Sequence, residues 1–278
     1  MFACGDLVSA MTEMSKENWG AGGPYELYVG RWSRKVAMEF LDWISVPAKA
    51  AWAEVGSGTG ALTQCILARC DPRSIAGIDK AEGFIATARQ AVADSRVTFD
   101  SGDAAKLPWE SDTFDAAVSG LVLNFVPDPQ KMLSEMVRVT RSGGRVAVYV
   151  WDYAGGMEMM RHFWDAAIAV SLDDSKLEQA ERFPICQPEP LEALFIDTGL
   201  KAVLSRSIAI PTVFKNFDDY WLPFLGKQGA APTYLASVNE EIREKIRARL
   251  QARLLPSLDG TIPLRTSAWA VQGTVPSQ

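Results

Sequence analysis

A glycine-rich loop at residues 56–60, which read Gly-Ser-Gly-Thr-Gly, follows a short apolar run that contains one acid, Glu54. Residues 61–69 after the loop have the composition of a helix. In a strand, loop and helix of this kind, glycines let the backbone approach a ligand, and the helix N-terminus offers free N–H groups. The stretch predicts a binding site for a cofactor that contains a nucleoside. A glycine turn without a ligand is the alternative.

A carboxylate, Asp79, ends a second apolar run at residues 74–78. In this position a carboxylate can accept hydrogen bonds from both hydroxyls of a ribose. It can equally cap the predicted helix 81–93. Residues 56–61 also satisfy the dinucleotide fingerprint, so these features fit a nicotinamide dinucleotide and S-adenosylmethionine equally well.

The elements that must position these residues alternate between strand and helix. We predict strands over 51–55, 74–78, 97–101, 114–119 and 144–151, and helices over 60–69, 81–93 and 128–140. Such alternation predicts a parallel sheet with helices on both faces and ligands at the carboxyl ends of the strands. The residues of interest all follow or end predicted strands: Gly56, Asp79, Asp103 and Ser119.

Five motifs in register resemble those of the class I S-adenosylmethionine-dependent methyltransferases, in the branch of the ubiquinone/menaquinone C-methyltransferases. They are EVGSGTG at 54–60, GID at 77–79, GDAAKLPW at 102–109, FDAAVS at 114–119 and RSGGRV at 141–146. The resemblance implies a Rossmann-like, doubly wound α/β fold. Its seven-stranded sheet should be mostly parallel, with an antiparallel last strand and a helical lid.

The resemblance also implies S-adenosylmethionine as the cofactor and assigns its contacts. The methionine end is expected against Tyr25, Arg31, Glu54, Gly56, Ser57, Gly58 and Gly60. The adenosine is expected against Asp79, Lys80, Asp103 and Ala104, and the methionyl portion over Ser119 and Leu121.

A hydrolase would need a catalytic set such as Ser-His-Asp, and none stands out in the sequence. A sulfonium methyl is already activated, so alignment and exclusion of water can carry methyl transfer. Three residues are candidates for a catalytic role. They are Asn124 after the fourth predicted strand, His162, the only histidine, and Tyr28 in an aromatic N-terminal segment.

The composition narrows the partners of the chain. Its 278 residues are 48% hydrophobic with a net charge of −6, which argues against a nucleic-acid partner. No apolar run reaches the ~18–20 residues that span a membrane, and no secretory signal is recognisable, so we expect a cytoplasmic protein. The cysteines Cys4, Cys65, Cys70 and Cys186 form no C-x-x-C pair. They predict free thiols and no metal site.

We expect a tail over 1–22 and one methyltransferase domain over 23–278, with a cofactor-binding core over about 45–151. The segments 155–190 and 212–257 should build the lid and the acceptor pocket, the second as a mobile helical cover. Two local features are also expected. Ser33 should cap the N-terminal helix, and Pro223, Gly226, Gly229 and Pro232 should form turns.

A helix over 238–255 has one apolar residue per turn, a stripe that is wide enough to dock on another element but too narrow for a core helix. The lid segments are rich in aromatic residues, among them Phe163, Trp164, Phe214, Trp221 and Phe224. These residues indicate a flat or apolar substrate, or else only the core of the lid.

The sequence favours methyl transfer by in-line displacement to a small-molecule acceptor that is aromatic or apolar. A nicotinamide-dinucleotide oxidoreductase is one alternative, but it leaves 102–109 and 114–128 unexplained. A non-catalytic S-adenosylmethionine-binding protein of the same fold is another. The identity of the acceptor, the methylated atom and the oligomeric state cannot be read from these residues.

Overall fold

The computed structural model describes residues 26–170, 183–226 and 229–277. Tyr25 and the predicted tail 1–22 therefore lie outside the described residues. The chain divides into two compact units. The sheet unit comprises Gly30–Asp152, Pro184–Ile210 and Ser267–Gln278, and the helical unit comprises Met1–Val29, Tyr153–Phe183 and Pro211–Thr266. The predicted segment 212–257 belongs wholly to the helical unit.

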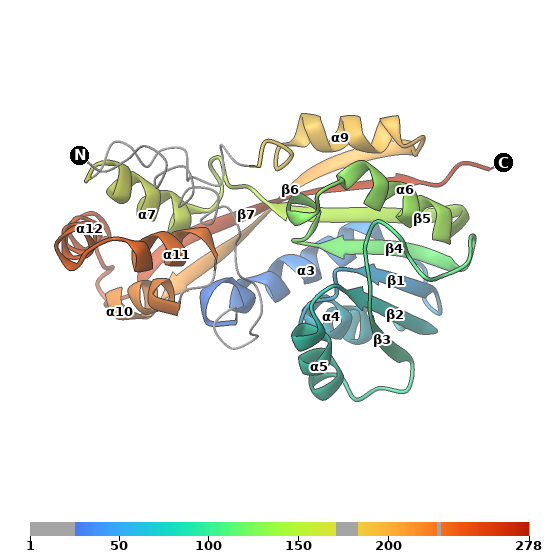
Figure 1. Cartoon of the computed structure of the whole chain (residues 1–278), viewed down its shortest axis with the longest axis horizontal. Helices are drawn as coiled ribbons and strands as arrows, with labels where there is room; N and C mark the ends of the chain where they lie inside the picture. Colours follow the sequence, from blue (N-terminus) through green and yellow to red (C-terminus); the bar gives the residue numbers. More distant parts are fainter. Residues whose placement is uncertain (1–25, 171–182, 227–228, 278) are drawn as a thin grey trace, which may run out of the picture. The chain divides into compact units, whose positions relative to one another are not determined.

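A seven-stranded sheet with the order β3-β2-β1-β4-β5-β7-β6 forms the framework (Figure 1). Its strands are β1 (Ala51–Val55), β2 (Ser74–Asp79), β3 (Val97–Ser101), β4 (Phe114–Gly120), β5 (Thr140–Trp151), β6 (Lys201–Phe214) and β7 (Ile262–Thr274). The pairs β2–β3, β1–β2, β1–β4 and β4–β5 are parallel, and β7 pairs antiparallel with β5. The predicted fold class is confirmed.

Helices cover both faces of the sheet within the sheet unit (Figure 1). They are α3 (Arg31–Ile44), α4 (Ala61–Arg69), α5 (Glu82–Ala91), α6 (Pro129–Val139) and α9 (Pro188–Asp197), with a short 3-10 turn η2 (Leu123–Phe125) after β4. In α3, Phe40 contacts Tyr149 of β5 with ring centroids 4.7 Å apart. On the opposite face, a side chain at Gly273 of β7 would meet Phe195 of α9 and Leu200, which follows that helix. All five residues of β1 are buried, which agrees with its apolar character apart from Glu54.

The ends of these helices have local causes. Asp128 caps α6 by accepting the N–H of Lys131 at 2.9 Å, and Gly199 follows α9 with a φ of +90°. The prediction that Ser33 caps α3 is wrong. The helix begins at Arg31, and the Ser33 hydroxyl is buried and donates to the carbonyl of Gly30 at 2.7 Å.

The helical unit has an aromatic core of its own. It contains α7 (Glu158–Ile168), α10 (Phe217–Trp221), the 3-10 turn η4 (Leu222–Gly226), α11 (Ala230–Ser237) and α12 (Glu240–Arg253), with most of the π-helical turn η1 (Glu26–Gly30). Phe163 of α7 stacks on Phe224 of η4 with ring centroids 4.7 Å apart. Tyr234 of α11 meets Phe163 edge to face. No helix among the described residues is long and apolar enough to cross a membrane.

One expectation for the helical unit is wrong. Pro232 does not form a turn but lies in the first turn of α11, where its missing N–H leaves no hydrogen bond unmade. The narrow apolar stripe of α12 serves as a docking face, because Ile246 and Leu250 are fully buried while every other residue of the helix is at least partly exposed. One residue per turn is enough here, since the other sides of α12 carry charged residues that stay in water.

Candidate functional site

The glycine loop after β1 has a backbone conformation that requires glycine at some of its positions. Gly56 has a φ of +77°, and an added Cβ would lie 2.5 Å from the side chain of Val122. Its N–H donates to the carbonyl of Ile78 at 2.7 Å, which ties the loop to β2. At Gly58 a Cβ would meet no atom within 4 Å. Gly60 closes the loop by donating its N–H to Ser57 O at 2.9 Å.

Asp79 joins this loop to the end of β2. One carboxylate oxygen accepts the N–H of Gly58 at 2.9 Å, and the other accepts the N–H of Ala81, just before α5, at 2.8 Å. Burial raises the pKa of Asp79 above its ordinary value. Each carboxylate oxygen has a second lone pair, so the group can hold these amides and accept further donors. The N-cap of α5 is Ala81 and has no side-chain cap hydrogen bond, so the expectation that Asp79 caps this helix is wrong. Its bond to Ala81 N–H instead fixes the turn before the helix and leaves room for a ligand.

Glu54 is buried inside β1 next to the loop. Its carboxyl group accepts a hydrogen bond from the hydroxyl of Thr63, in the first turn of α4. Burial raises the pKa of Glu54 to about 8. A cationic group brought to this carboxyl would favour its ionised form. Sequence reasoning missed Thr63, although a hydroxyl in the first turn after the loop is a usable signal.

The loop after β3 carries Asp103 and Ala104. It is tied to β2 where the N–H of Gly102 donates to Asp79 O at 3.0 Å. Asp103 is exposed, and one of its carboxylate oxygens accepts the N–H of Ala105 at 2.9 Å. The carboxylate is therefore oriented by its own loop and remains accessible to a donor.

Three buried polar atoms close to these strand ends have no hydrogen-bond partner among the described residues. They are the hydroxyls of Ser57 and Ser119 and the amide nitrogen of Asn124. Leaving a buried polar group unpaired costs roughly 1–3 kcal/mol, and such groups are rare in folded proteins. A polar ligand at the carboxyl ends of β1 and β4 would satisfy them. The residues present thus fit a cofactor with several donors and acceptors.

Known proteins match this arrangement in sequence. A family model described as a methyltransferase domain matches residues 53–148. The chain is 38% identical over 118 residues to 2-methyl-6-phytyl-1,4-hydroquinone methyltransferase 2 of Oryza sativa. The matched stretch covers 41% of this chain and only 33% of that protein. It is 35% identical over 188 residues to a demethylmenaquinone methyltransferase of Shouchella clausii, over 63% of this chain and 79% of that protein. The chain belongs to the class I S-adenosylmethionine-dependent methyltransferases.

A solved structure shares the fold of this methyltransferase chain. It is a phosphoethanolamine N-methyltransferase of Haemonchus contortus in complex with S-adenosyl-L-methionine, with a TM-score of 0.58 and 16% identity over 91% of this chain and 56% of that one. At this identity the likeness concerns the fold alone.

The remaining predicted residues of the methyltransferase are distributed over both units. In the sheet unit, the Arg31 guanidinium lies 4.6 Å from the ring centroid of Trp32. Lys80 is exposed directly after β2, and Leu121 donates its N–H to Tyr149 O at 2.8 Å. Asn124 lies in η2 of the same unit. Lys80, Leu121 and Asn124 follow the carboxyl ends of β2 and β4, whereas Arg31 begins α3, and the roles of all four stay predictions.

Two catalytic candidates of the methyltransferase lie in the helical unit. The buried hydroxyl of Tyr28 donates to the sulfur of Met160 at 2.9 Å. His162 is half-buried on α7, and burial, followed by the positive charge of Arg253, lowers its pKa. Neither observation assigns these residues a part in catalysis.

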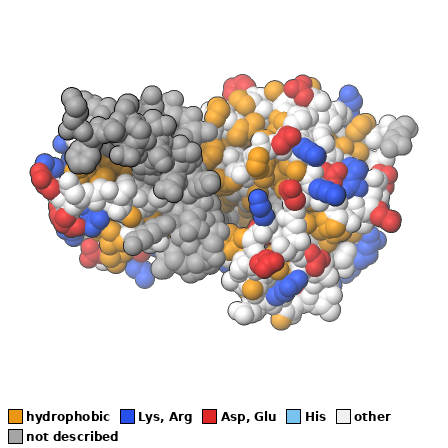
Figure 2. All heavy atoms as spheres, viewed as in Figure 1, with side chains coloured by type: hydrophobic (Ala, Val, Ile, Leu, Met, Phe, Trp, Pro, Cys, Tyr) orange, Lys and Arg blue, Asp and Glu red, His pale blue; other side chains and the backbone are white. Residues whose placement is uncertain are grey.

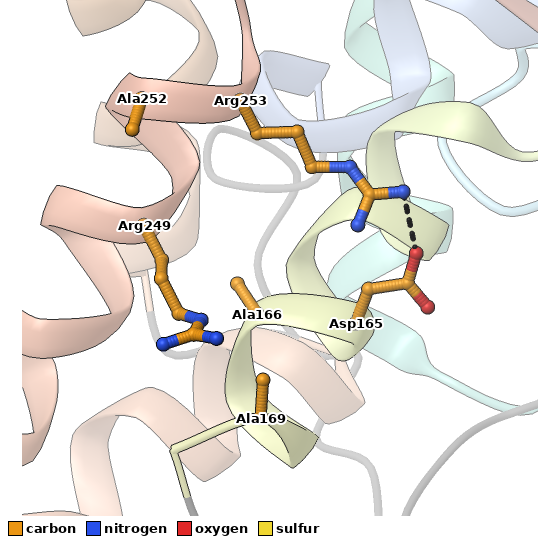
Figure 3. A pocket seen from close by; sticks show the side chains of 6 residues that line it. All are labelled: Asp165, Ala166, Ala169, Arg249, Ala252 and Arg253. Atoms are coloured by element: carbon orange, nitrogen blue, oxygen red, sulfur yellow. Dashed lines mark ion pairs between the residues drawn. The ribbon is translucent and has the colours of Figure 1, made fainter.

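The helical unit also contains a cavity of about 300 Å³ between α7 and α12 (Figure 3). It is lined by Asp165, Ala166, Ala169, Arg249, Ala252 and Arg253, and Arg253 forms an ion pair with Asp165 at 2.8 Å. None of the predicted cofactor residues lines it. On the face shown in Figure 2, basic and acidic side chains of the described residues are interspersed and no continuous basic patch forms.

Proposed function

We propose that this chain transfers the methyl group of S-adenosylmethionine to a small aromatic acceptor of the hydroquinone class. The observation that carries the proposal is the contact between Asp79 and Gly58, which brings a carboxylate and the glycine loop into one site. The names of the relatives support the acceptor class, because both are named for quinone-type compounds.

The cofactor supplies a methyl group on a positively charged sulfur, whose departure leaves a neutral thioether. The chain has to bind and orient it. Asp79 accepts the two ribose hydroxyls, Asp103 accepts from the amino group of adenine, and the backbone at Gly58 lies against the methionine end. Glu54 provides the negative charge for the ammonium group. Transfer would proceed by in-line displacement, in which the acceptor atom forms its bond to the methyl carbon as the carbon–sulfur bond breaks and the acceptor then loses one proton to solvent. Alignment, and exclusion of water during the transfer, are the main requirements.

Asn124 completes the proposed site on the acceptor side. Its amide nitrogen is buried and has no partner among the described residues. As a hydrogen-bond donor it can hold a ring oxygen of the acceptor. In this role Asn124 orients the ring and does not accept a proton. A cytoplasmic location remains part of the proposal, with Cys65, Cys70 and Cys186 as free thiols.

Methyl transfer from isotopically labelled S-adenosylmethionine tests this function. The acceptors should be hydroquinones with and without a prenyl chain, with simple phenols and catechols as comparison. We expect label in a hydroquinone, and mass spectrometry of the product will identify the methylated atom. Binding of S-adenosylhomocysteine without label in any acceptor would favour the non-catalytic alternative.

A further inference from the structure

The segment that carries Asp103 and Ala104, residues 102–109, is held at both ends. We call it the adenine loop, because the proposed function, on which its role rests, places adenine against it. At its start, the N–H of Gly102 donates to Asp79 O at 3.0 Å, and a side chain at Gly102 would lie 2.3 Å from Ile78. The first residue of the loop is thus fixed against β2.

The far end of the adenine loop is held by two side chains of α6. Glu135 accepts the N–H of Leu107 at 2.8 Å. Arg138 donates to the carbonyl oxygens of Leu107 at 3.1 Å and Trp109 at 2.9 Å. Three backbone groups of the loop are therefore bonded to one turn of a helix.

Glu135 and Arg138 also fix each other. The guanidinium donates from Nε to one carboxylate oxygen at 2.6 Å and from Nη2 to the other at 2.7 Å. The hydrogen bond from Arg138 holds the pKa of Glu135 below its ordinary value. We call these two residues the α6 clamp.

An exposed ion pair contributes little to the stability of a protein. The α6 clamp differs from an exposed pair in two respects. The side chains of Glu135 and Arg138 are only 19% and 35% exposed. The pair is bidentate, and both members keep further hydrogen bonds to the backbone, which adds geometric specificity. An ion pair that only stabilised α6 would not need three bonds to a loop that follows another strand.

We propose that Glu135 and Arg138 are positioning residues that hold the adenine loop, so that Asp103 meets the amino group of adenine. The clamp touches neither the cofactor nor the acceptor. It acts through the loop, whose middle is ordered only by local bonds such as that from Ala105 N–H to Asp103. Without the clamp, the far end of the loop keeps only the buried side chain of Leu107 and the edge-to-face contact of Trp109 with Phe114, and it loses the hydrogen bonds that fix its backbone. The carboxylate of Asp103 is then held less precisely.

The test is a comparison of two ligands. Calorimetry should measure the affinity of Arg138→Lys and Glu135→Ala for S-adenosylhomocysteine and for its analogue with oxygen in place of the adenine amino group. Lysine keeps the charge but cannot reproduce the forked donor set. We expect each variant to lose about tenfold in affinity for S-adenosylhomocysteine, the size of one charge-assisted hydrogen bond, and much less for the analogue. Asp103→Ala removes the carboxylate that meets the adenine amino group. In that background, either Arg138→Lys or Glu135→Ala should lower the affinity for S-adenosylhomocysteine little further.

Asp42 and Arg69 provide a matched control, because they form a bidentate pair at 2.6 and 2.7 Å between α3 and α4. Asp42→Asn should leave both affinities unchanged. Equal losses for both ligands, or affinities like those of the unmodified protein, would overturn the inference. An unmodified protein that does not bind S-adenosylhomocysteine would instead overturn the proposed function. Thermal melts of each variant show whether it is folded, and Arg138→Lys provides the test if Glu135→Ala does not fold.

Discussion

The carboxylate of Asp79 accepts the backbone N–H of Gly58 at 2.9 Å, so the acid that ends β2 holds the middle of the loop that follows β1. Two motifs that are separated in sequence thereby form one surface. The bond also fixes the direction of the carboxylate before any ligand is bound. The site is therefore preorganised, which lowers the cost of ordering it on binding.

Replacement of Asp79 by alanine should weaken binding of S-adenosylhomocysteine by about 2–3 kcal/mol, because charge-assisted bonds to the ribose are lost. The fold should survive. The free energy of unfolding should nevertheless fall by about 1–2 kcal/mol, since the N–H groups of Gly58 and Ala81 lose their acceptor. Calorimetry and urea unfolding measure the two effects. Asp79→Asn keeps one acceptor oxygen, so its affinity and its stability should lie between those of the unmodified protein and those of Asp79→Ala. An unchanged affinity in Asp79→Ala would place the ribose elsewhere.

Two glycines of the loop should respond differently to alanine. In Gly56→Ala the new Cβ would lie 2.5 Å from Val122. The free energy of unfolding should therefore fall by about 1–3 kcal/mol, in addition to the cost of placing alanine at a positive φ. Gly58→Ala meets no atom within 4 Å and should cost only about 1 kcal/mol from its positive φ. We expect Gly58→Ala to fold and to bind S-adenosylhomocysteine poorly, because its methyl group occupies the space that the ligand needs.

The packing explanation for Gly56 can be tested directly. Adding Val122→Ala to Gly56→Ala should recover part of the lost stability, measured by urea unfolding. If the double variant is as unstable as the sum of the two single changes, contact with Val122 is not the cause.

The stability of the ligand-free protein should depend on pH through Glu54. Its pKa is about 8 in the folded chain and near 4.5 when unfolded, so the folded state binds the proton more tightly. This contribution to stability is fully present below about pH 4.5 and is lost as the pH rises toward 8. Urea unfolding between pH 5 and 8 should show a steeper decline for the unmodified protein than for Glu54→Gln. Parallel profiles would mean that Glu54 does not change its protonation in this range.

The helical unit should open separately from the sheet. Leu250 is fully buried in α12. Leu250→Ala should therefore lower the free energy of unfolding by about 2–5 kcal/mol. Leu255, which is 75% exposed, supplies a control whose replacement by alanine should change little. Hydrogen exchange should show faster opening of α12 in Leu250→Ala and unchanged protection in β1 and β4. Equal acceleration in the strands would show that the two units unfold together.

The mobile cover expected over 212–257 stays a prediction, and the same exchange experiment tests it. Addition of S-adenosylhomocysteine and an acceptor should slow exchange in this segment if it closes over the substrate. Protection that equals that of the central strands and ignores ligand would make the segment a fixed part of the core.

Most of the fold could be predicted from the sequence, because apolar runs and helical spacing report burial locally. Trp52 to Val55 and Ser74 to Ile78 read as buried strands, and the glycine loop marked the turn between β1 and α4. Errors arose where tertiary contacts decide the outcome. Ser33 has the chemistry of a helix cap, but its hydroxyl is used inside α3. Pro232 looks like a turn residue until its place in the first helical turn is known.

In the candidate site, too, some residues could be predicted from the sequence and others could not. Asp79 and Asp103 could be located because they follow strands whose ends converge at one edge of the sheet. The residues that hold them could not. Glu135 and Arg138 have helical spacing that suggests only a surface ion pair, and their contacts with Leu107 and Trp109 depend on how α6 packs. The protonation of Glu54 likewise follows from its burial and from Thr63 in three dimensions.

Calorimetric titration of the unmodified protein with S-adenosylhomocysteine and, separately, with NADH tests the central claim most directly. Both ligands carry an adenosine whose ribose could meet Asp79, so the comparison isolates the rest of the site. We predict saturable binding of S-adenosylhomocysteine, weakened in Asp79→Ala, and no binding of NADH. Binding of NADH alone would contradict the account and favour an oxidoreductase.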